Sequence, residues 1–168
     1  PMFAIVSYFC HQHKGMEIYT ATLGNGIKII HSTQPGAVGY CGLIINAGSR
    51  DEQPDEHGLA HFIEHVIFKG TRKRRAYHIL SRLDDVGGEL NAYTTKEETC
   101  IYASFLYQDY DRALELIHDI TFNSVFPDKE LEKEKEVIID EINSYKDSPS
   151  EQIYDDFEEM LFKNDPMG

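Results

Sequence analysis

The sequence has 168 residues, of which 41% are hydrophobic and 11% aromatic, a composition that supports one globular domain and excludes a disordered or fibrous chain. No apolar run is long enough to span a membrane, so we expect a soluble protein. With 29 acidic against 16 basic residues, the net charge of −13 argues against nucleic acid as the main partner and favours cationic partners, because phosphate binding needs concentrated Lys and Arg.

The N-terminal segment, residues 1–15, is expected to be a flexible leader. It lacks the positive region and the small-residue cleavage site of a secretory signal, which favours a cytoplasmic location. Cys10, His11 and His13 resemble a metal cluster by residue type, but in a flexible leader they would be inert. Because the chain begins with Pro1 and stops without a closing element, we expect it to be the N-terminal part of a longer protein.

The cysteines are three in number and widely spaced, at Cys10, Cys41 and Cys100. An odd count without a C-x-x-C pair predicts neither a disulfide framework nor a zinc site made of thiolates. A reducing compartment fits this pattern.

The chain then opens with strands. Two alternating segments, 17–23 and 27–32, flank Gly24-Asn25-Gly26, whose residues tolerate positive φ, and together they predict a hairpin. Residues 38–47 read as a buried strand, and a polar loop over 48–54 follows it.

Helical periodicity begins after this loop. Apolar side chains recur at helical spacing over 57–68, and Pro54 with Asp55 is the expected entry to that helix. The other predicted elements are helices over 76–86, 110–123, 127–145 and 149–162 and strands over 89–94 and 99–106. This mixture predicts an α+β fold in which an antiparallel or mixed sheet packs against helices.

The first predicted helix contains the segment His61-Phe62-Ile63-Glu64-His65, which has the spacing H-x-x-E-H, the reverse of the H-E-x-x-H order of ordinary zinc proteases. Residues three and four apart share one face of a helix, so His61, Glu64 and His65 point into the same space. Two imidazoles and a carboxylate placed in this way can hold zinc and activate water. His57 shares this face, but zinc needs only three protein ligands, so we do not expect it to bind.

A catalytic zinc ion usually has three protein ligands, so the two histidines need a third partner. Glu141 lies inside an apolar stripe of the helix predicted over 127–145, where an unpaired charge would be costly unless it met a cation or a metal. Glu134 lies two turns earlier on nearly the same face and could orient a ligand histidine. In this arrangement Glu64 accepts a proton from the attacking water and passes it to the leaving amine, which is metal-assisted amide hydrolysis.

The motif and the blocks around it resemble the pitrilysin or insulinase family of zinc peptidases, which includes the mitochondrial processing peptidase. The resemblance covers 46–50 with Glu52, 58–65, 68–71, 87–94 with Thr99 and Tyr102, and 134–143. It implies a metallopeptidase half-domain with one Zn²⁺ per chain. The site residues that it implies are His61, His65 and Glu141 as ligands, Glu64 as general base and Glu134 as support for a ligand.

The same resemblance implies a peptidase that takes extended or unfolded peptides into a closed chamber. Asn91 and Ala92 would lie on an edge strand that pairs with the backbone of the substrate. A second, similarly folded domain, on the same chain or on a partner, would face the zinc and supply an Arg and Tyr pair. These 168 residues contain no counterpart of that pair.

Two charged segments allow more than one interpretation. Lys69 and residues 72–75 form a basic run, which we interpret as a solvated loop rather than a nucleic-acid site. Residues 128–159 carry 13 acidic and 4 basic side chains. They would either steer basic peptides toward the site or form a solvated helical face.

A non-catalytic alternative is a peptide-binding or scaffolding subunit of the same family, with structural or vestigial zinc. Such subunits characteristically lose motif residues, whereas His61, Glu64, His65 and Glu141 are all present here. We therefore interpret the chain as a zinc-dependent endopeptidase domain that needs a second homologous domain for full activity.

Overall fold

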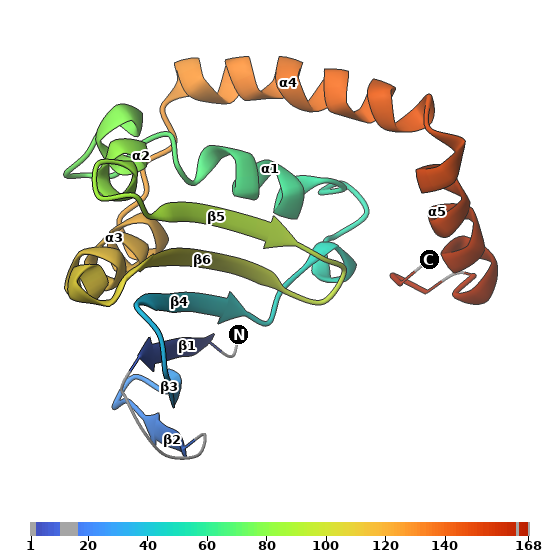
Figure 1. Ribbon diagram of the computed structural model, residues 1–168. Coiled ribbons are helices and arrows are strands. Elements are labelled where there is room, and N and C mark those ends of the chain that lie inside the picture. The colour runs from blue at the N-terminus through green and yellow to red at the C-terminus, as the bar shows by residue number, and fades with distance from the viewer. Residues whose placement is uncertain (1–2, 11–16, 164, 168) are drawn as a thin grey trace.

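The computed structural model describes residues 3–10, 17–163 and 165–167, and its centre is one six-stranded sheet (Figure 1). The strands are β1 (Phe3–Cys10), β2 (Glu17–Thr22), β3 (Lys28–Gln34), β4 (Val38–Ile45), β5 (Glu89–Thr94) and β6 (Thr99–Leu106). They lie in the order β2-β3-β1-β4-β6-β5. β1 and β3 are parallel and the other neighbouring pairs are antiparallel, so the predicted α+β fold with a mixed sheet is confirmed.

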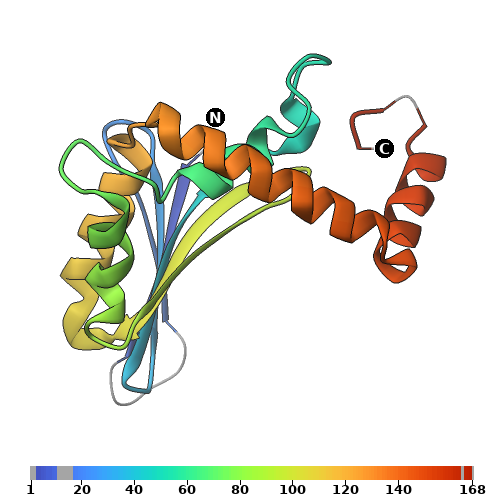
Figure 2. The ribbon, with the colours of Figure 1, turned by 90° about the horizontal axis from the view of Figure 1, so that it is seen from above.

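The helices are α1 (Leu59–Val66), α2 (Ala76–Asp84), α3 (Tyr110–Phe122), α4 (Asp128–Lys146) and α5 (Pro149–Leu161). α3 packs on β4 and β6, α2 packs on α3, and α1 lies beside the edge strand β5 with α4 across it (Figure 1). α4 extends past the sheet and carries α5 away from it (Figure 2). No helix in the described ranges combines the length and the apolar character needed to cross a membrane.

The hydrophobic core lies between the sheet and the pair α2 and α3. In β6, Ile101, Ala103 and Phe105 are buried while Tyr102 and Leu106 are exposed, which is the alternation of a strand with one covered face. The remaining buried members of this core are Cys41, Leu43, Ile67, Ile79, Leu83, Ala113, Leu116, Ile117 and Ile120. Burial on one face therefore fixes the register of the strands that lead to the site.

Most predicted elements are present. β5 and β6 have the predicted bounds, β2 and β3 form the predicted hairpin, and Gly26 in its turn has a φ of 88°. All five helices begin and end within about two residues of the predicted positions, and α1 is two residues shorter at each end than predicted.

The prediction of a flexible leader is wrong for residues 3–10. These residues form β1, which lies inside the sheet between β3 and β4 and pairs with both. The segment is rich in β-branched and aromatic residues, and this composition favours a strand over a flexible leader. Cys10 ends β1, whereas His11 and His13 lie outside the described residues.

A buried polar network ties the segment after α1 to α3. Asp119 is only 1% exposed and accepts hydrogen bonds from Thr71 Oγ1 at 2.8 Å, Arg74 Nη1 at 2.5 Å and Asn123 Nδ2 at 3.1 Å. Arg74 also donates from Nη2 to both carboxylate oxygens of Glu115, at 2.9 and 2.8 Å. Arg74 therefore belongs to the interior of the fold and not to a solvated basic loop.

This network predicts a stability that depends on pH. Burial alone would raise the pKa of Asp119, but the hydrogen bonds from Thr71 and Arg74 outweigh it and lower that pKa below its usual value. The stabilisation is thus present at neutral pH and is lost as the pH falls from about 4 through the lowered pKa. We expect Asp119→Asn to reduce the free energy of unfolding by about 3 kcal/mol at pH 7 and by less at pH 3, where the loss of this stabilisation has begun.

Urea unfolding at pH 7 and pH 3 measures both values. Asp111→Asn, an exposed acid on the same helix, is the control and should change little at either pH. An Asp119→Asn deficit that is equal at the two pH values would contradict the ionic role of Asp119.

Candidate metal centre

α1 presents His61 and His65 one helical turn apart. Their Nε2 atoms lie 3.1 Å from each other, and the two rings meet nearly at a right angle, with an interplanar angle of 87°. This is the shared face that the i, i+4 spacing predicts. Both nitrogens point at one position beside the helix.

The start of α1 is built by Gly58 and Glu52. Gly58, directly before the helix, has a φ of 86°, a left-handed conformation that L side chains rarely adopt. The Glu52 carboxylate accepts hydrogen bonds from the backbone N–H groups of Gly58 at 2.8 Å and Ala60 at 2.7 Å, which a helix start otherwise leaves unpaired. The helix therefore begins at Leu59, and the predicted entry at Pro54 is wrong.

The loop that carries Glu52 is itself fixed on the turn between β5 and β6. The backbone N–H of Ser49 donates to the carbonyl of Thr95 at 3.1 Å, and that of Arg50 donates to the carbonyl of Lys96 at 3.0 Å. A side chain at Gly48 would meet the Thr95 carbonyl oxygen at 2.3 Å, so this close approach requires glycine. The position of α1 along β5 follows from these contacts.

α4 brings Glu141 to the two histidines. Its Oε2 atom lies 3.6 Å from His61 Nε2 and 3.2 Å from His65 Nε2. Ligand atoms around a tetrahedral zinc ion, each about 2.0–2.1 Å from the metal, lie about 3.3 Å apart. The three edges, 3.1, 3.2 and 3.6 Å, match that separation, so this donor set of two imidazoles and a carboxylate fits zinc.

Glu134 lies behind His65, on the side away from this triangle. Its Oε2 atom is 3.4 Å from His65 Nδ1, while its Oε1 atom is 2.6 Å from Lys69 Nζ. Glu134 is the buried residue of α4, with its side chain 10% exposed, whereas the Glu141 side chain is 54% exposed. The buried charge expected at Glu141 is therefore at Glu134, although Glu141 does lie at the histidines.

Sequence reasoning missed Lys69. The basic run was interpreted as a solvated loop, which holds for the exposed residues Arg72, Lys73 and Arg75. Lys69 instead turns back to a carboxylate on α4. Its spacing indicates this position, because Lys69 follows His65 by four residues and lies just beyond the end of α1, so it can reach the same side as His65.

Glu64 lies on α1 between the two histidines and is partly buried. Within the described part of the chain, its carboxylate makes neither a hydrogen bond nor an ion pair. A carboxylate without such partners is available to take a proton from a nearby donor. The role of Glu64 as general base stays a prediction.

β5 is an edge strand that borders the site. It pairs with β6 on one side, through Asn91 with Tyr102 and Ala92 with Ile101, and it is the last strand of the sheet on the other. Asn91 is exposed, and Ala92 is partly buried against the hydrophobic core. The predicted edge position of Asn91 and Ala92 is confirmed, and their contact with a substrate stays a prediction.

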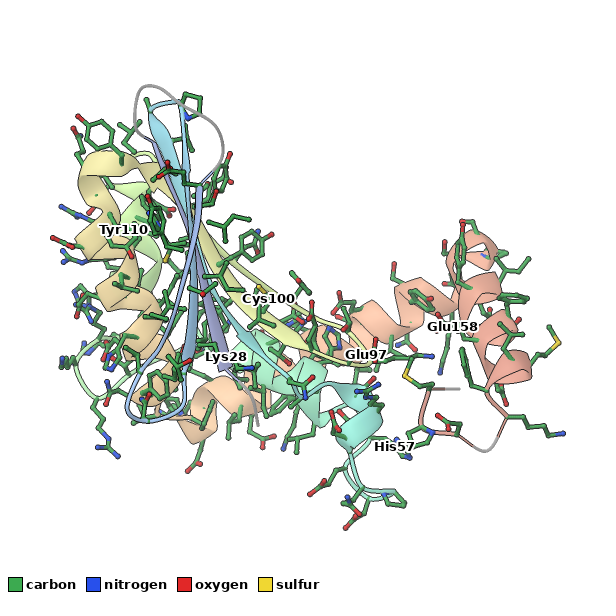
Figure 3. The ribbon with its side chains drawn as sticks, turned by 90° about the horizontal axis from the view of Figure 1, so that it is seen from below. Lys28, His57, Glu97, Cys100, Tyr110 and Glu158 are labelled. Atoms are coloured by element: carbon green, nitrogen blue, oxygen red, sulfur yellow. The ribbon has the colours of Figure 1, made fainter. Side chains whose placement is uncertain are left out.

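Other candidate ligands lie elsewhere. His57 is exposed before α1 (Figure 3) and lines an apolar groove with Leu59, Phe62, Ile138 and Ile142. That groove, of about 490 Å³, runs between α1 and α4. His57 does not belong to the candidate metal-binding group that the described residues form.

Among the described side chains, Cys41 and Cys100 are both free and buried. Burial raises the pKa of Cys41 to about 12, so this thiol stays protonated and is a poor metal ligand.

α5 contacts the turn between β5 and β6. Lys96, in the turn between β5 and β6, contacts Glu158 of α5 at 2.6 Å and donates to the Met167 carbonyl oxygen at 2.7 Å. Figure 3 shows Glu97 in the same turn and Glu158 on the neighbouring helix. These contacts connect α5 to the end of the edge strand.

Comparison with known proteins gives a consistent result. Residues 28–168 match the family described as Insulinase (Peptidase family M16). A protein of Rickettsia bellii, called an uncharacterized zinc protease, is 41% identical over 147 residues, which are 87% of this chain and 36% of that protein. A probable mitochondrial-processing peptidase subunit beta of Arabidopsis thaliana is 35% identical over 161 residues, 94% of this chain and 30% of the relative.

Solved structures share the fold. A protease from Helicobacter pylori superimposes with a TM-score of 0.85 at 25% identity, over 90% of this chain and 37% of that one. A peptidase M16 inactive domain from Pseudomonas fluorescens gives 0.80 at 17% identity with the same coverage, a likeness of fold alone. The chain spans about a third of the length of the curated relatives it matches. With its match over residues 28–168, the chain belongs to the insulinase family of peptidases, peptidase family M16.

Proposed function

We propose that this chain is the zinc-bearing N-terminal domain of a metalloendopeptidase that hydrolyses peptide bonds in extended or unfolded peptides. The observation that carries the proposal is the triangle of His61 Nε2, His65 Nε2 and Glu141 Oε2, whose edges of 3.1 to 3.6 Å suit a tetrahedral zinc ion. The names of the relatives, several of them zinc proteases, support the choice of metal. The proposed stoichiometry is one Zn²⁺ per chain.

When bound, zinc supplies Lewis acidity that polarises the peptide carbonyl and lowers the pKa of the attacking water. Glu64 takes the proton of that water and returns it to the leaving amine, as its position beside both histidines allows. Glu134 holds His65 through Nδ1, so that Nε2 of this imidazole stays directed at the ligand triangle.

The substrate is proposed to add to the open edge of β5. Unpaired N–H and C=O groups along an edge strand bind a peptide backbone with little regard to its sequence. Asn91 and Ala92 would make these contacts, beside α1 and its histidines. The acidic residues of 128–159, 13 against 4 basic, favour basic peptides through long-range attraction.

A second homologous domain, on the same chain or a partner, is proposed to complete the enzyme. The side chains of His61 and Glu141 are 41% and 54% exposed, so the ligand face is open to solvent on this chain. Exclusion of bulk water strengthens electrostatic stabilisation of a transition state. A domain that covers this face would supply that exclusion and form the chamber.

The alternative is a non-catalytic peptide-binding or scaffolding subunit. The fold alone does not separate the two functions, since one structure with this fold is described as an inactive domain. The presence of Glu64 together with the three-donor triangle favours the enzyme. A scaffolding subunit has no need of a general base beside a metal site.

The ligand assignment predicts that Glu141→Gln lowers zinc affinity by more than about tenfold, because a neutral amide is a weaker zinc ligand than a carboxylate. Zinc per chain after exhaustive dialysis, with competition by a chelator, measures this effect. Glu136→Gln, an exposed glutamate of the same helix, is the control and should keep full zinc. Equal zinc in Glu141→Gln and the unmodified chain would remove Glu141 from the ligand set.

The assignment of the base predicts that Glu64→Gln keeps zinc and loses about 10²- to 10⁴-fold in the rate of peptide hydrolysis, the usual contribution of general-base catalysis. The assay requires the complete polypeptide with its second domain, and quenched fluorescent peptides report cleavage. Glu56→Gln, an exposed acid before α1, is the control. Retained turnover in Glu64→Gln would assign the proton transfer to another group, and an inactive complete protein would favour the scaffolding subunit.

The edge-strand proposal predicts that an unstructured basic peptide, added to the complete Glu64→Gln protein, slows hydrogen exchange of the β5 amides. Pairing of the peptide backbone with this edge would protect the amides that face it. β2, the opposite edge of the sheet, is the internal control and should not change. Protection at β2 but not at β5 would contradict the proposed binding mode.

A further inference from the structure

The carboxylate of Glu134 bridges two side chains from outside its own helix. One oxygen lies 2.6 Å from Lys69 Nζ and the other 3.4 Å from His65 Nδ1. The Lys69 side chain is 27% exposed and that of Glu134 only 10%, so the pair is largely shielded from water. Lys69 thus restricts the orientation of the Glu134 carboxylate, and this carboxylate restricts the orientation of the His65 imidazole.

The surroundings distinguish this ion pair from the others on α4. Lys133 and Glu130 pair with side chains 67% and 30% exposed, and Lys135 and Glu132 pair at 55% and 72%. Such exposed pairs contribute about 0–1 kcal/mol and leave their members mobile. A shielded carboxylate depends far more on its cation, because removing one partner leaves a charge without compensation.

The main chain of Lys69 is held by the interior of the protein. Its N–H donates to the carbonyl of Val66 at 3.0 Å, at the end of α1. The next residues, Gly70 and Thr71, form bridges with Arg75 and Ser124, and Thr71 reaches the buried Asp119. The Lys69 ammonium group therefore reaches Glu134 from a segment, residues 69–71, whose backbone is fixed by these contacts.

We propose that Lys69 is a positioning residue of the metal centre, which fixes the Glu134 carboxylate beside His65 Nδ1 and thereby directs His65 Nε2 at the metal. The proposal rests on the zinc site proposed above. Lys69 does not touch the ligand triangle, and it acts through Glu134 alone. Without it, the carboxylate loses one of its two anchors, and the imidazole gains freedom to turn away.

The test is the zinc affinity of the chain, measured by chelator competition, together with the visible spectrum of its Co²⁺ form, which reports ligand geometry. We expect Lys69→Met to weaken zinc binding by about tenfold, at the lower end of the 10–100-fold typical of groups that support metal ligands. Lys69→Arg should restore most of the affinity, since it keeps the charge. Lys133→Met, which removes an exposed lysine of α4, should leave the affinity unchanged.

A double-mutant cycle decides whether Lys69 acts through Glu134. In a Glu134→Gln background, Lys69→Met should cost less than about twofold, because the group it positions is already altered. A full tenfold loss in that background would overturn the proposal. A merely structural role of Lys69 would lower the thermal midpoint of the metal-free chain without this dependence on Glu134.

The outcomes separate this inference from the proposed function. If the unmodified chain binds no zinc, the zinc site itself fails. If it binds zinc and Lys69→Met binds equally well, only the role of Lys69 is overturned. Should Lys69→Met not fold, Lys69→Gln is measured instead, and unchanged affinity there overturns the proposal while a loss of threefold or more supports it.

Discussion

The contact between α1 and α4 is the constraint on which the site depends. These helices are separated in sequence by two strands and two helices, yet their side chains bring three donor atoms within 3.1 to 3.6 Å of one another. A change of about 1 Å in the spacing of the helices would open this triangle beyond what a zinc ion can span. Leu59, Phe62, Ile138 and Ile142 line the apolar groove that runs between the two helices beside this triangle.

Polar contacts outside the triangle fix both α1 and α4. α1 is capped by Glu52, whose loop is fixed on the turn after β5, and its C-terminal end continues into the segment tied to α3 by Asp119. α4 carries one buried charge, Glu134, and that charge meets both α1 and the segment after it. Polar interactions thus orient the candidate ligands, while the apolar core between the sheet, α2 and α3 supports them.

The elements that sequence periodicity specifies were predictable, and those that depend on distant partners were not. β5, β6 and the hairpin follow from alternation and turn chemistry, and the i, i+4 spacing put His61 and His65 on one face. β1 was missed because a strand at a chain end has no local signal beyond its composition, and its partners β3 and β4 come later. The start of α1 was missed because its cap, Glu52, lies outside the usual capping position. The buried glutamate of α4 is Glu134, although the sequence predicted Glu141. The position of a residue in the apolar stripe of one helix does not reveal which glutamate faces a lysine from another segment.

The central place of β1 also governs the order in which the sheet can form. β1 is the first strand in the chain but lies between β3 and β4, and its parallel partner arrives only after the hairpin of β2 and β3. During synthesis this strand stays unpaired until β3 is available and gains its second partner only with β4, and parallel pairing of this kind closes slowly. Without β1, the sheet would separate into a two-stranded ribbon and a three-stranded part that carries the edge beside the candidate metal centre. While β1 is still unpaired during folding, its free backbone groups can pair with strands of other chains. Aggregation is therefore most favoured at this stage of folding.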